Sequence, residues 1–183
     1  MVVRLEFSRR YSMAHRLLDD SASKCLTPHG HDEVVTVRLK PLQALALGGS
    51  NMAGSFEKAK GRWHRWIDGQ VDHAFQVNAR DPLVDYFKAN EPELLKRLMV
   101  FDGDPTTEAL AIAFLLKLSA FLKDDGDLFS VERVAIQETP TNRVVLTAAD
   151  WAGSGLDWTP GAWTLRADPS LNDLLPAQAW EAE

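Results

Sequence analysis

The chain reads CLTPHGHDEVVTVRL over residues 25–39, where its clearest strand pattern follows its densest group of chemically active side chains. Apolar and polar residues alternate through Val35, Val37 and Leu39, a pattern typical of a half-buried strand. His29 and His31 are two positions apart, so in an extended segment both imidazoles project from the same face. The pair alone permits two interpretations: converging metal ligands, or two unrelated polar histidines in a loop.

A third histidine lies near a second predicted strand. Residues 2–11 also alternate, with Leu5 and Phe7 on the apolar side, and His15 lies just after this strand. If this strand pairs with the one after His31, all three imidazoles can meet. Three histidines with an open fourth position form the ligand set of a catalytic zinc site.

The remaining pattern predicts an α+β fold. Apolar residues take helical spacing from Ser55 to Ala74, and Leu98–Phe101 is a short strand candidate. Asp104 suits an N-cap and Pro105 the first position of a helix that continues to Phe121. Two β-rich runs, 129–138 and 143–147, are joined by a turn. This order of elements favours antiparallel strand pairs rather than alternating βαβ units.

Other side chains offer proton transfer or ligand binding. Cys25 is either a packing residue or, close to a metal cation, a thiolate base or nucleophile. Asp72 and His73 form either surface polarity at a helix end or a proton-transfer pair. Glu138, at a strand end, is either solvated or a bidentate acceptor for a ring with adjacent N–H donors, such as a pterin or guanine.

Length and composition limit the class of protein. The chain has 183 residues, enough for one domain, and a single cysteine, which favours a reducing cytoplasm. No apolar run approaches the roughly 18 residues of a membrane span, and the N-terminus has no apolar signal region, so a membrane partner is not expected. The net charge of −6 comes with no basic stripe, so nucleic acid is not an expected partner either.

The last 34 residues differ from the rest. Residues 150–183 carry a net charge of −5 and four of the six tryptophans. A disordered segment rarely contains so many indoles, so we expect this segment to pack on the body or on a neighbouring subunit, with Trp180 loose. We therefore divide the chain into residues 1–149 and a C-terminal extension, 150–183.

Five motifs occur in order between residues 3 and 147: Ala14-His15-Arg16-Leu17, Cys25-x-x-x-His29-Gly30-His31, Val71-Asp72-His73, Pro105-Thr106-Thr107-Glu108 and Glu138-Thr139-Pro140. Together they resemble the 6-pyruvoyl-tetrahydropterin synthase and 6-carboxy-tetrahydropterin synthase family. The resemblance implies a tunnelling fold, in which a four-stranded antiparallel sheet carries two main helices on one face. It also implies an oligomeric barrel, with hexamers of a single chain.

The resemblance also implies residue roles. His15, His29 and His31 bind Zn²⁺, and Cys25 is the general acid/base, assisted by Asp72 and His73 from a neighbouring subunit. Glu138 anchors the pterin ring, with Thr106 and Thr107 lining its pocket.

The implied substrate is a small-molecule pterin triphosphate. We expect a zinc-dependent lyase that converts 7,8-dihydroneopterin triphosphate to 6-carboxy-tetrahydropterin, the queuosine precursor step. The alternatives are 6-pyruvoyl-tetrahydropterin synthase activity and a non-catalytic pterin- or metal-binding homologue. Departures from the family pattern bear on substrate identity. The chain has Asp32-Glu33-Val34 where the family commonly has an aromatic residue soon after His-Gly-His, and Ser55-Phe56 where it commonly has Asp-Phe. It also has Ala109 where Asn is usual, and a long segment, 80–104.

Overall fold

The computed structural model describes residues 3–19, 23–45 and 47–180. The described residues form these strands: β1 (Leu5–His15), β2 (His29–Pro41), β3 (Ala74–Asn78), β4 (Leu98–Phe101), β5 (Phe129–Gln137) and β6 (Arg143–Thr147). The α-helices are α1 (Ser23–Leu26), α2 (Phe56–Trp66), α3 (Pro82–Asn90), α4 (Thr107–Asp124) and α5 (Ala148–Gly153). No helix among them is long and apolar enough to cross a membrane.

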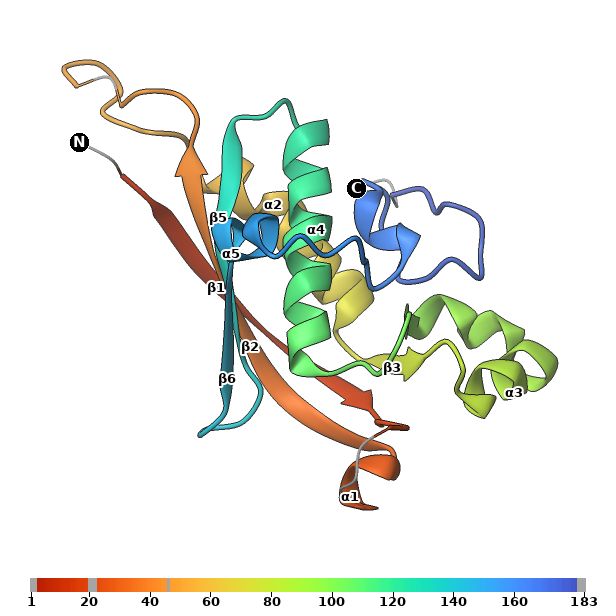
Figure 1. The fold of residues 1–183 in the computed structure, drawn as a ribbon. Helices are drawn as coiled ribbons and strands as arrows, with labels where there is room; N and C mark the ends of the chain where they lie inside the picture. Colours follow the sequence, from red (N-terminus) through yellow and green to blue (C-terminus); the bar gives the residue numbers. More distant parts are fainter. Residues whose placement is uncertain (1–2, 20–22, 46, 181–183) are drawn as a thin grey trace.

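The strands form one mixed sheet in the order β4-β3-β1-β2-β5-β6. The expected four-stranded antiparallel sheet is present as β1-β2-β5-β6, but it is part of a larger sheet, because β3 joins β1 and β4 joins β3 in parallel. Parallel neighbours need a crossover connection, which α3 provides between β3 and β4 (Figure 1). The description as a four-stranded antiparallel sheet was therefore wrong.

Strand β3 lies where the sequence predicted the end of a helix. Helix α2 ends at Trp66, a π-helical turn follows over Ile67–Val71, and His73 takes a positive φ of 64° before Ala74 begins the strand. Its residues are mostly buried, so the sequence shows no apolar–polar alternation there. The short strand predicted at Leu98–Phe101 is confirmed as β4.

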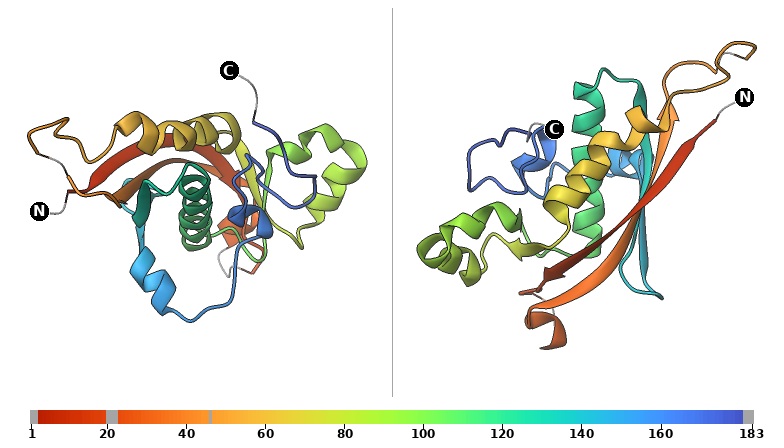
Figure 2. Two further views of the ribbon diagram at one scale, coloured as in Figure 1. Left: turned by 90° about the horizontal axis from the view of Figure 1, so that it is seen from above. Right: turned by 180° about the vertical axis from the view of Figure 1, so that it is seen from behind.

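Helices α2 and α4 cover one face of the sheet (Figures 1 and 2). Alternate residues of β1 are buried on that face, as the period of two in its sequence predicted. The N-cap of α4 is Thr106, whose side chain accepts a hydrogen bond from the Ala109 N–H, rather than the predicted Asp104. The carboxylate of Asp104 instead accepts hydrogen bonds from the Asn78 side chain and from the Asp19 N–H, which join two loops.

The C-terminal segment packs along the outer edge of the sheet. Trp163 has no exposed surface, and its indole N–H donates to the Val100 carbonyl at 2.8 Å. The Val100 N–H in turn donates to the Leu171 carbonyl at 3.1 Å. Because Val100 lies in β4, these bonds occupy backbone groups of an edge strand that would otherwise be open to pairing.

Two further contacts attach this segment to the helices. Lys117 of α4 is fully buried, and its ammonium group donates to the Trp163 carbonyl at 2.9 Å. Trp180 was expected to be loose, but its ring lies 5.5 Å from that of Phe121, and its N–H donates to the Ala167 carbonyl. That expectation was wrong because the sequence does not show that Arg62 and Phe121 offer Trp180 a cationic and aromatic surface.

Candidate metal and ligand site

Three histidines converge at the ends of β1 and β2. His15 ends β1 and His29 begins β2, and the two residues are direct cross-strand partners. His31 follows on the same face as His29, opposite Met13. One ring nitrogen from each histidine lies within 4.8 Å of the others, and the Nε2 atoms of His15 and His29 are 3.1 Å apart. The cluster could hold a metal ion.

Backbone carbonyls fix the orientation of two of these rings. Nδ1 of His15 lies 3.0 Å from the Pro105 carbonyl, and Nδ1 of His29 lies 2.9 Å from the Thr27 carbonyl. Since a carbonyl only accepts, both Nδ1 atoms carry the proton, and the Nε2 lone pairs face each other. Burial lowers the pKa of His15 and so favours its neutral form. Facing lone pairs repel unless a cation lies between them, so this donor set fits a metal ion.

Gly30, between His29 and His31, is required for the close pairing of β2 with β1. A Cβ at Gly30 would lie 2.7 Å from the Met13 carbonyl oxygen, closer than real Cβ contacts come. Only glycine therefore lets β2 approach β1 closely enough for His15 and His29 to face each other.

The carboxylate of Glu138, the residue that follows β5, lies beside the cluster and contacts the start of α4. The Thr107 hydroxyl donates to Oε1 of Glu138 at 2.6 Å, and Thr106 caps the same helix. Pro105, two residues before Thr107, holds the ring of His15. The first turn of α4 therefore joins the predicted ring-anchoring end of the site to the histidine cluster.

The structure adds Glu33, which the sequence reasoning did not assign to the site. Glu33 is buried on β2, and the Tyr11 hydroxyl donates to its Oε2 at 2.5 Å. Burial raises the pKa of Glu33 to about 7, the Tyr11 hydrogen bond opposes that rise, and the charge of Glu138 adds to it. The period of two through His29 and His31 was the available signal, because it continues to residue 33.

Two other predicted residues lie apart from this cluster. His73 and Asp72 interact at 2.9 Å, and the backbone N–H of Ser12 donates to Asp72. The His73 side chain is 78% exposed, and neither residue belongs to the group of converging metal-ligating atoms. Within one chain the structure does not bring Asp72 and His73 to the histidines.

Cys25 lies in the one-turn helix α1, four residues before His29, where the sequence had predicted a loop. Its side chain is half-buried, and its carbonyl accepts a hydrogen bond from the Leu17 N–H at 2.8 Å. This bond ties α1 to the chain leaving β1, at the end of the β1–β2 pair where His15 and His29 lie.

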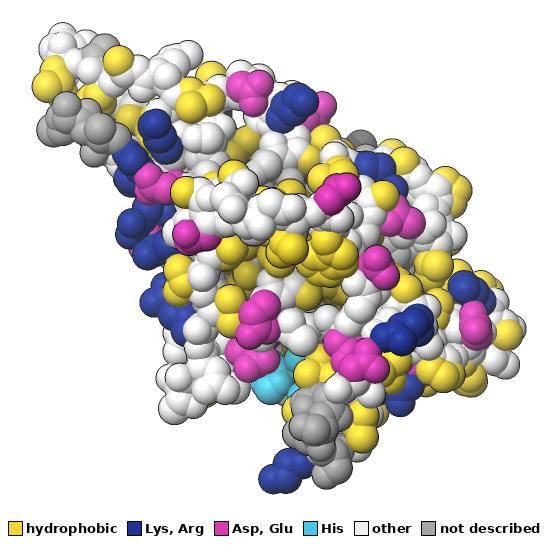
Figure 3. Space-filling view, in the orientation of Figure 1, with side chains coloured by type: hydrophobic (Ala, Val, Ile, Leu, Met, Phe, Trp, Pro, Cys, Tyr) yellow, Lys and Arg dark blue, Asp and Glu magenta, His cyan; other side chains and the backbone are white. Residues whose placement is uncertain are grey.

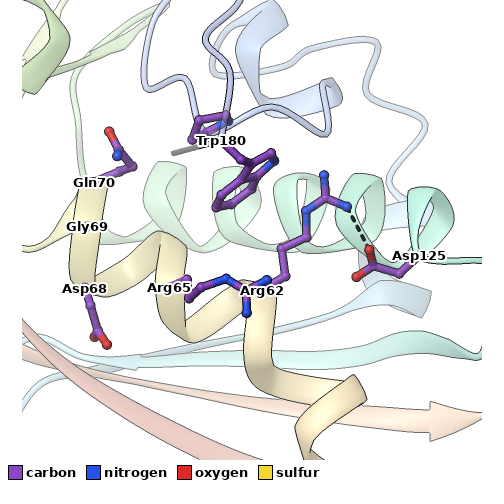
Figure 4. Close-up of a pocket in the computed structure, with 8 residues that line it drawn as sticks. Arg62, Arg65, Asp68, Gly69, Gln70, Asp125 and Trp180 are labelled. Carbon is purple, nitrogen blue, oxygen red and sulfur yellow. Dashed lines mark hydrogen bonds and ion pairs between the residues drawn. The ribbon is translucent and has the colours of Figure 1, made fainter. Parts of the chain in front are cut away.

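The surface around the histidines is acidic. Figure 3 shows histidine side chains at the lower end of one face, bordered by acidic groups. A separate cavity of about 660 Å³ lies between α2 and the C-terminal segment, where Arg62 and Trp180 line it (Figure 4). Arg62 donates to both Asp124 and Asp125 at 2.8 Å, so its charge is already paired.

The fold and the site define an α+β protein whose sheet presents three imidazoles able to hold a metal ion, next to a carboxylate held by a long helix. The chain matches the family model described as 6-pyruvoyl tetrahydropterin synthase over residues 4–149. It therefore belongs to the 6-pyruvoyl tetrahydropterin synthase family, and the resemblance seen in its motifs is confirmed. No curated protein sequence matches it significantly.

Solved structures share the fold. An uncharacterised protein from Wolinella succinogenes superposes with a TM-score of 0.64 at 21% identity, covering 81% of this chain and 99% of that one. The 6-pyruvoyl tetrahydropterin synthase of Caenorhabditis elegans gives 0.55 at 24% identity, covering 81% and 96%. That of Plasmodium vivax gives 0.56 at 18% identity, covering 80% and 97%. At these identities the likeness concerns the fold.

Proposed function

We propose that this protein is a zinc-dependent lyase that converts 7,8-dihydroneopterin triphosphate to 6-carboxy-5,6,7,8-tetrahydropterin, releasing triphosphate and acetaldehyde. The observation that carries the proposal is the convergence of His15, His29 and His31 beside Glu138, which Thr107 holds. A metal-ligand set and a carboxylate acceptor for a ring are the two parts that this reaction needs.

Zinc is the metal that three imidazoles and an open fourth position fit best. When bound, it supplies a Lewis acid that polarises the hydroxyl oxygens of the substrate side chain. The carbonyls of Pro105 and Thr27 keep the ligand nitrogens of His15 and His29 directed at one point.

Cys25 is the proposed general acid/base, taking a proton from the substrate side chain at its Sγ and returning it. Asp72 and His73 assist proton transfer at the site of a neighbouring copy. This role requires a homo-oligomer, for which we propose the hexamer of the family, and the exposure of the His73 side chain leaves it accessible to a partner subunit.

Glu138 is the proposed acceptor for the pterin ring, with Thr106 and Thr107 forming the adjoining wall. Because the Thr107 hydroxyl donates to Oε1, the carboxylate is fixed while its second oxygen stays available for a ring N–H. Fixing the ring in this way holds the substrate side chain towards the histidines. We place the reaction in queuosine precursor synthesis in the cytoplasm.

Product analysis tests the proposal. Zinc-loaded protein is incubated with 7,8-dihydroneopterin triphosphate, and the pterin products and acetaldehyde are identified by mass spectrometry. We expect 6-carboxy-tetrahydropterin with equimolar acetaldehyde, lost in His31→Ala and kept in His64→Gln, which alters a histidine on α2. A 6-pyruvoyl product without acetaldehyde would instead assign the second family activity. Ligand binding with no turnover would assign a non-catalytic binding protein.

A further inference from the structure

Arg16 lies between two residues of the candidate site. The residue before it, His15, ends β1 and is one of the converging histidines. The residue after it, Leu17, donates its backbone N–H to the Cys25 carbonyl at 2.8 Å. A displacement of Arg16 would therefore move the point at which α1, the helix that carries Cys25, is attached near the histidines.

The Arg16 side chain is held by a buried carboxylate from a distant part of the chain. Its Nε donates to Oδ2 of Asp81 at 2.6 Å, and a terminal nitrogen of the same guanidinium donates to Oδ1. The Asp81 side chain has no exposed surface, and that of Arg16 is 21% exposed. Two charge-assisted hydrogen bonds to one carboxylate fix the plane of the guanidinium as well as its position, and burial reduces screening by solvent.

Asp81 is itself fixed in place by the fold. Its Oδ1 accepts a hydrogen bond from the Leu83 N–H at 2.9 Å and so caps α3, and its own N–H donates to the Asn78 carbonyl at 2.9 Å. Asn78 ends β3, which pairs in parallel with β1. The carboxylate that holds Arg16 is therefore attached to the same sheet that carries the histidines.

A second arginine–aspartate pair joins the same two segments at the surface. Arg80 donates to Asp19 at 2.7 Å, with side chains that are 69% and 67% exposed. Exposed pairs contribute little, because water competes for both charges and ordering two long side chains costs entropy. The two neighbouring pairs differ in burial, so comparing them isolates the effect of the buried one.

We propose that Arg16 is a positioning residue whose buried ion pair with Asp81 fixes the connection between β1 and β2, residues 16–28, so that Cys25 is held against the histidine cluster. The inference rests on the proposed function, in which Cys25 exchanges a proton with the substrate side chain. Arg16 acts only through the backbone of this connection. A misplacement of about 1 Å can cost a reaction about 100-fold in rate, so loosening the connection should slow turnover while ring binding at Glu138 is kept.

Three variants separate placement from stability. Arg16→Met keeps an unbranched side chain but cannot donate to Asp81. Because a buried charge without its partner destabilises a fold, Arg16→Met/Asp81→Asn also removes that charge, and the asparagine keeps an acceptor for the Leu83 N–H. Arg80→Met removes the exposed pair and is the matched control. Thermal melts establish that each variant is folded at the temperature of the assays.

Three measurements are made on the zinc-loaded proteins. Steady-state kinetics with 7,8-dihydroneopterin triphosphate give kcat and KM. The loss of free thiol to iodoacetamide is followed at about pH 9.5, where an ordinary thiol is mostly ionised, so that the rate reports access to the sulfur. Cys25 is the single cysteine, so this rate belongs to one residue and requires no turnover. Elemental analysis gives zinc per chain.

We expect Arg16→Met to lower kcat by about 10- to 100-fold with KM changed by less than about twofold. Alkylation of the half-buried Cys25 should become at least about threefold faster, because the local structure opens more easily. The double variant should regain stability but keep the low kcat and the fast alkylation. Zinc content should stay at the wild-type level, since strand pairing and the Pro105 carbonyl still hold His15.

The outcomes separate the two proposals. Wild type without turnover overturns the proposed lyase, and alkylation then decides by itself whether Arg16 fixes Cys25. An active wild type whose folded Arg16 variant has unchanged kcat and alkylation overturns the role of Arg16 and leaves the lyase standing. Recovery of kcat in the double variant would assign the pair to stability alone, and loss of zinc would assign it to the metal site. Either result, or an equal loss of kcat in Arg80→Met, overturns the proposed role.

Discussion

Replacing Lys117 by methionine should stabilise the protein at neutral pH, and the gain should disappear in alkaline solution. Lys117 is fully buried in α4, with its ammonium group 5.4 to 5.9 Å from the ring centres of Trp66, Phe121 and Trp163. The closest carboxylate is Asp168 at 3.7 Å. Burial lowers the pKa of Lys117 to about 7, Asp168 opposes that shift, and the charges of Arg166 and Arg62 add to it.

The size of the effect follows from the difference in pKa between the two states. The pKa falls from 10.5 to about 7 on folding, so the charged lysine costs the folded state about 4 to 5 kcal/mol. Methionine has a similar length and avoids this cost, but it loses the hydrogen bond to the Trp163 carbonyl, worth about 1 to 2 kcal/mol. The net gain near pH 6.5 is about 3 kcal/mol, or roughly 6 to 12 °C in melting temperature for a chain of this size.

The pH dependence of wild-type stability is opposite to the one usually expected for a lysine. Below pH 7 both folded and unfolded chains hold the proton, and wild type bears the full cost of the buried charge. Between pH 7 and 10.5 the unfolded chain keeps a proton that the folded chain has released, so wild-type stability rises with pH. At about 1.4 kcal/mol per pH unit, the advantage of Lys117→Met should therefore shrink across this range, vanish near about pH 9 and reverse above it.

Thermal melts of both proteins from pH 6 to 10 measure this difference directly. Lys123→Met, which removes an exposed charge from the same helix, controls for the loss of one positive charge. A melting-point difference between Lys117→Met and wild type that stays constant over the whole range would refute the reasoning. Such a result would mean that the buried lysine keeps its ordinary pKa.

Four further changes test the site and the fold. His31→Ala removes one of three ligands and should largely empty the metal site, as measured by elemental analysis of the purified protein; full metal content would contradict the ligand set. Cys25→Ala should keep zinc and pterin binding but lose about 10²- to 10⁴-fold in turnover, and wild-type rates would exclude its acid/base role. Gly30→Ala, whose Cβ would meet the Met13 carbonyl at 2.7 Å, should lower stability by about 1 to 3 kcal/mol and reduce metal content, both measurable by melting and metal analysis. Truncation after Ala149 removes the buried Trp163 and should reduce solubility and lower the melting point while zinc per folded chain survives; an unchanged melt would show the segment to be dispensable.

The histidine cluster was predictable because its geometry is local. His29 and His31 share a face through the period of two, and the pairing of β1 with β2 brings His15 opposite them. The alternation that predicts both strands also fixes which side chains face the helices. The metal-ligand geometry therefore needs nothing beyond one antiparallel strand pair.

The parts that sequence reasoning missed depend on contacts between distant segments. Strand β3 is short and buried, so no alternation marks it, and it exists because Met13–His15 offers it a partner. The carboxylate of Asp104 binds Asn78 and Asp19 in space, which leaves the helix cap to Thr106. Glu33 lies beside Glu138 through the register between β2 and β5, and no local pattern shows such a register.

The contact between the C-terminal segment and β4 has a consequence for how the two segments are inherited among homologues. The segment 80–104 supplies β4, and the chain after residue 149 supplies the carbonyls and the indole that cover it. A protein that kept β4 but lost the covering segment would expose an apolar strand edge to other chains. A protein that kept the C-terminal segment but lost β4 would leave the Trp163 indole without the strand that it contacts. Among homologues, we expect the two segments to be inherited together and to be absent together.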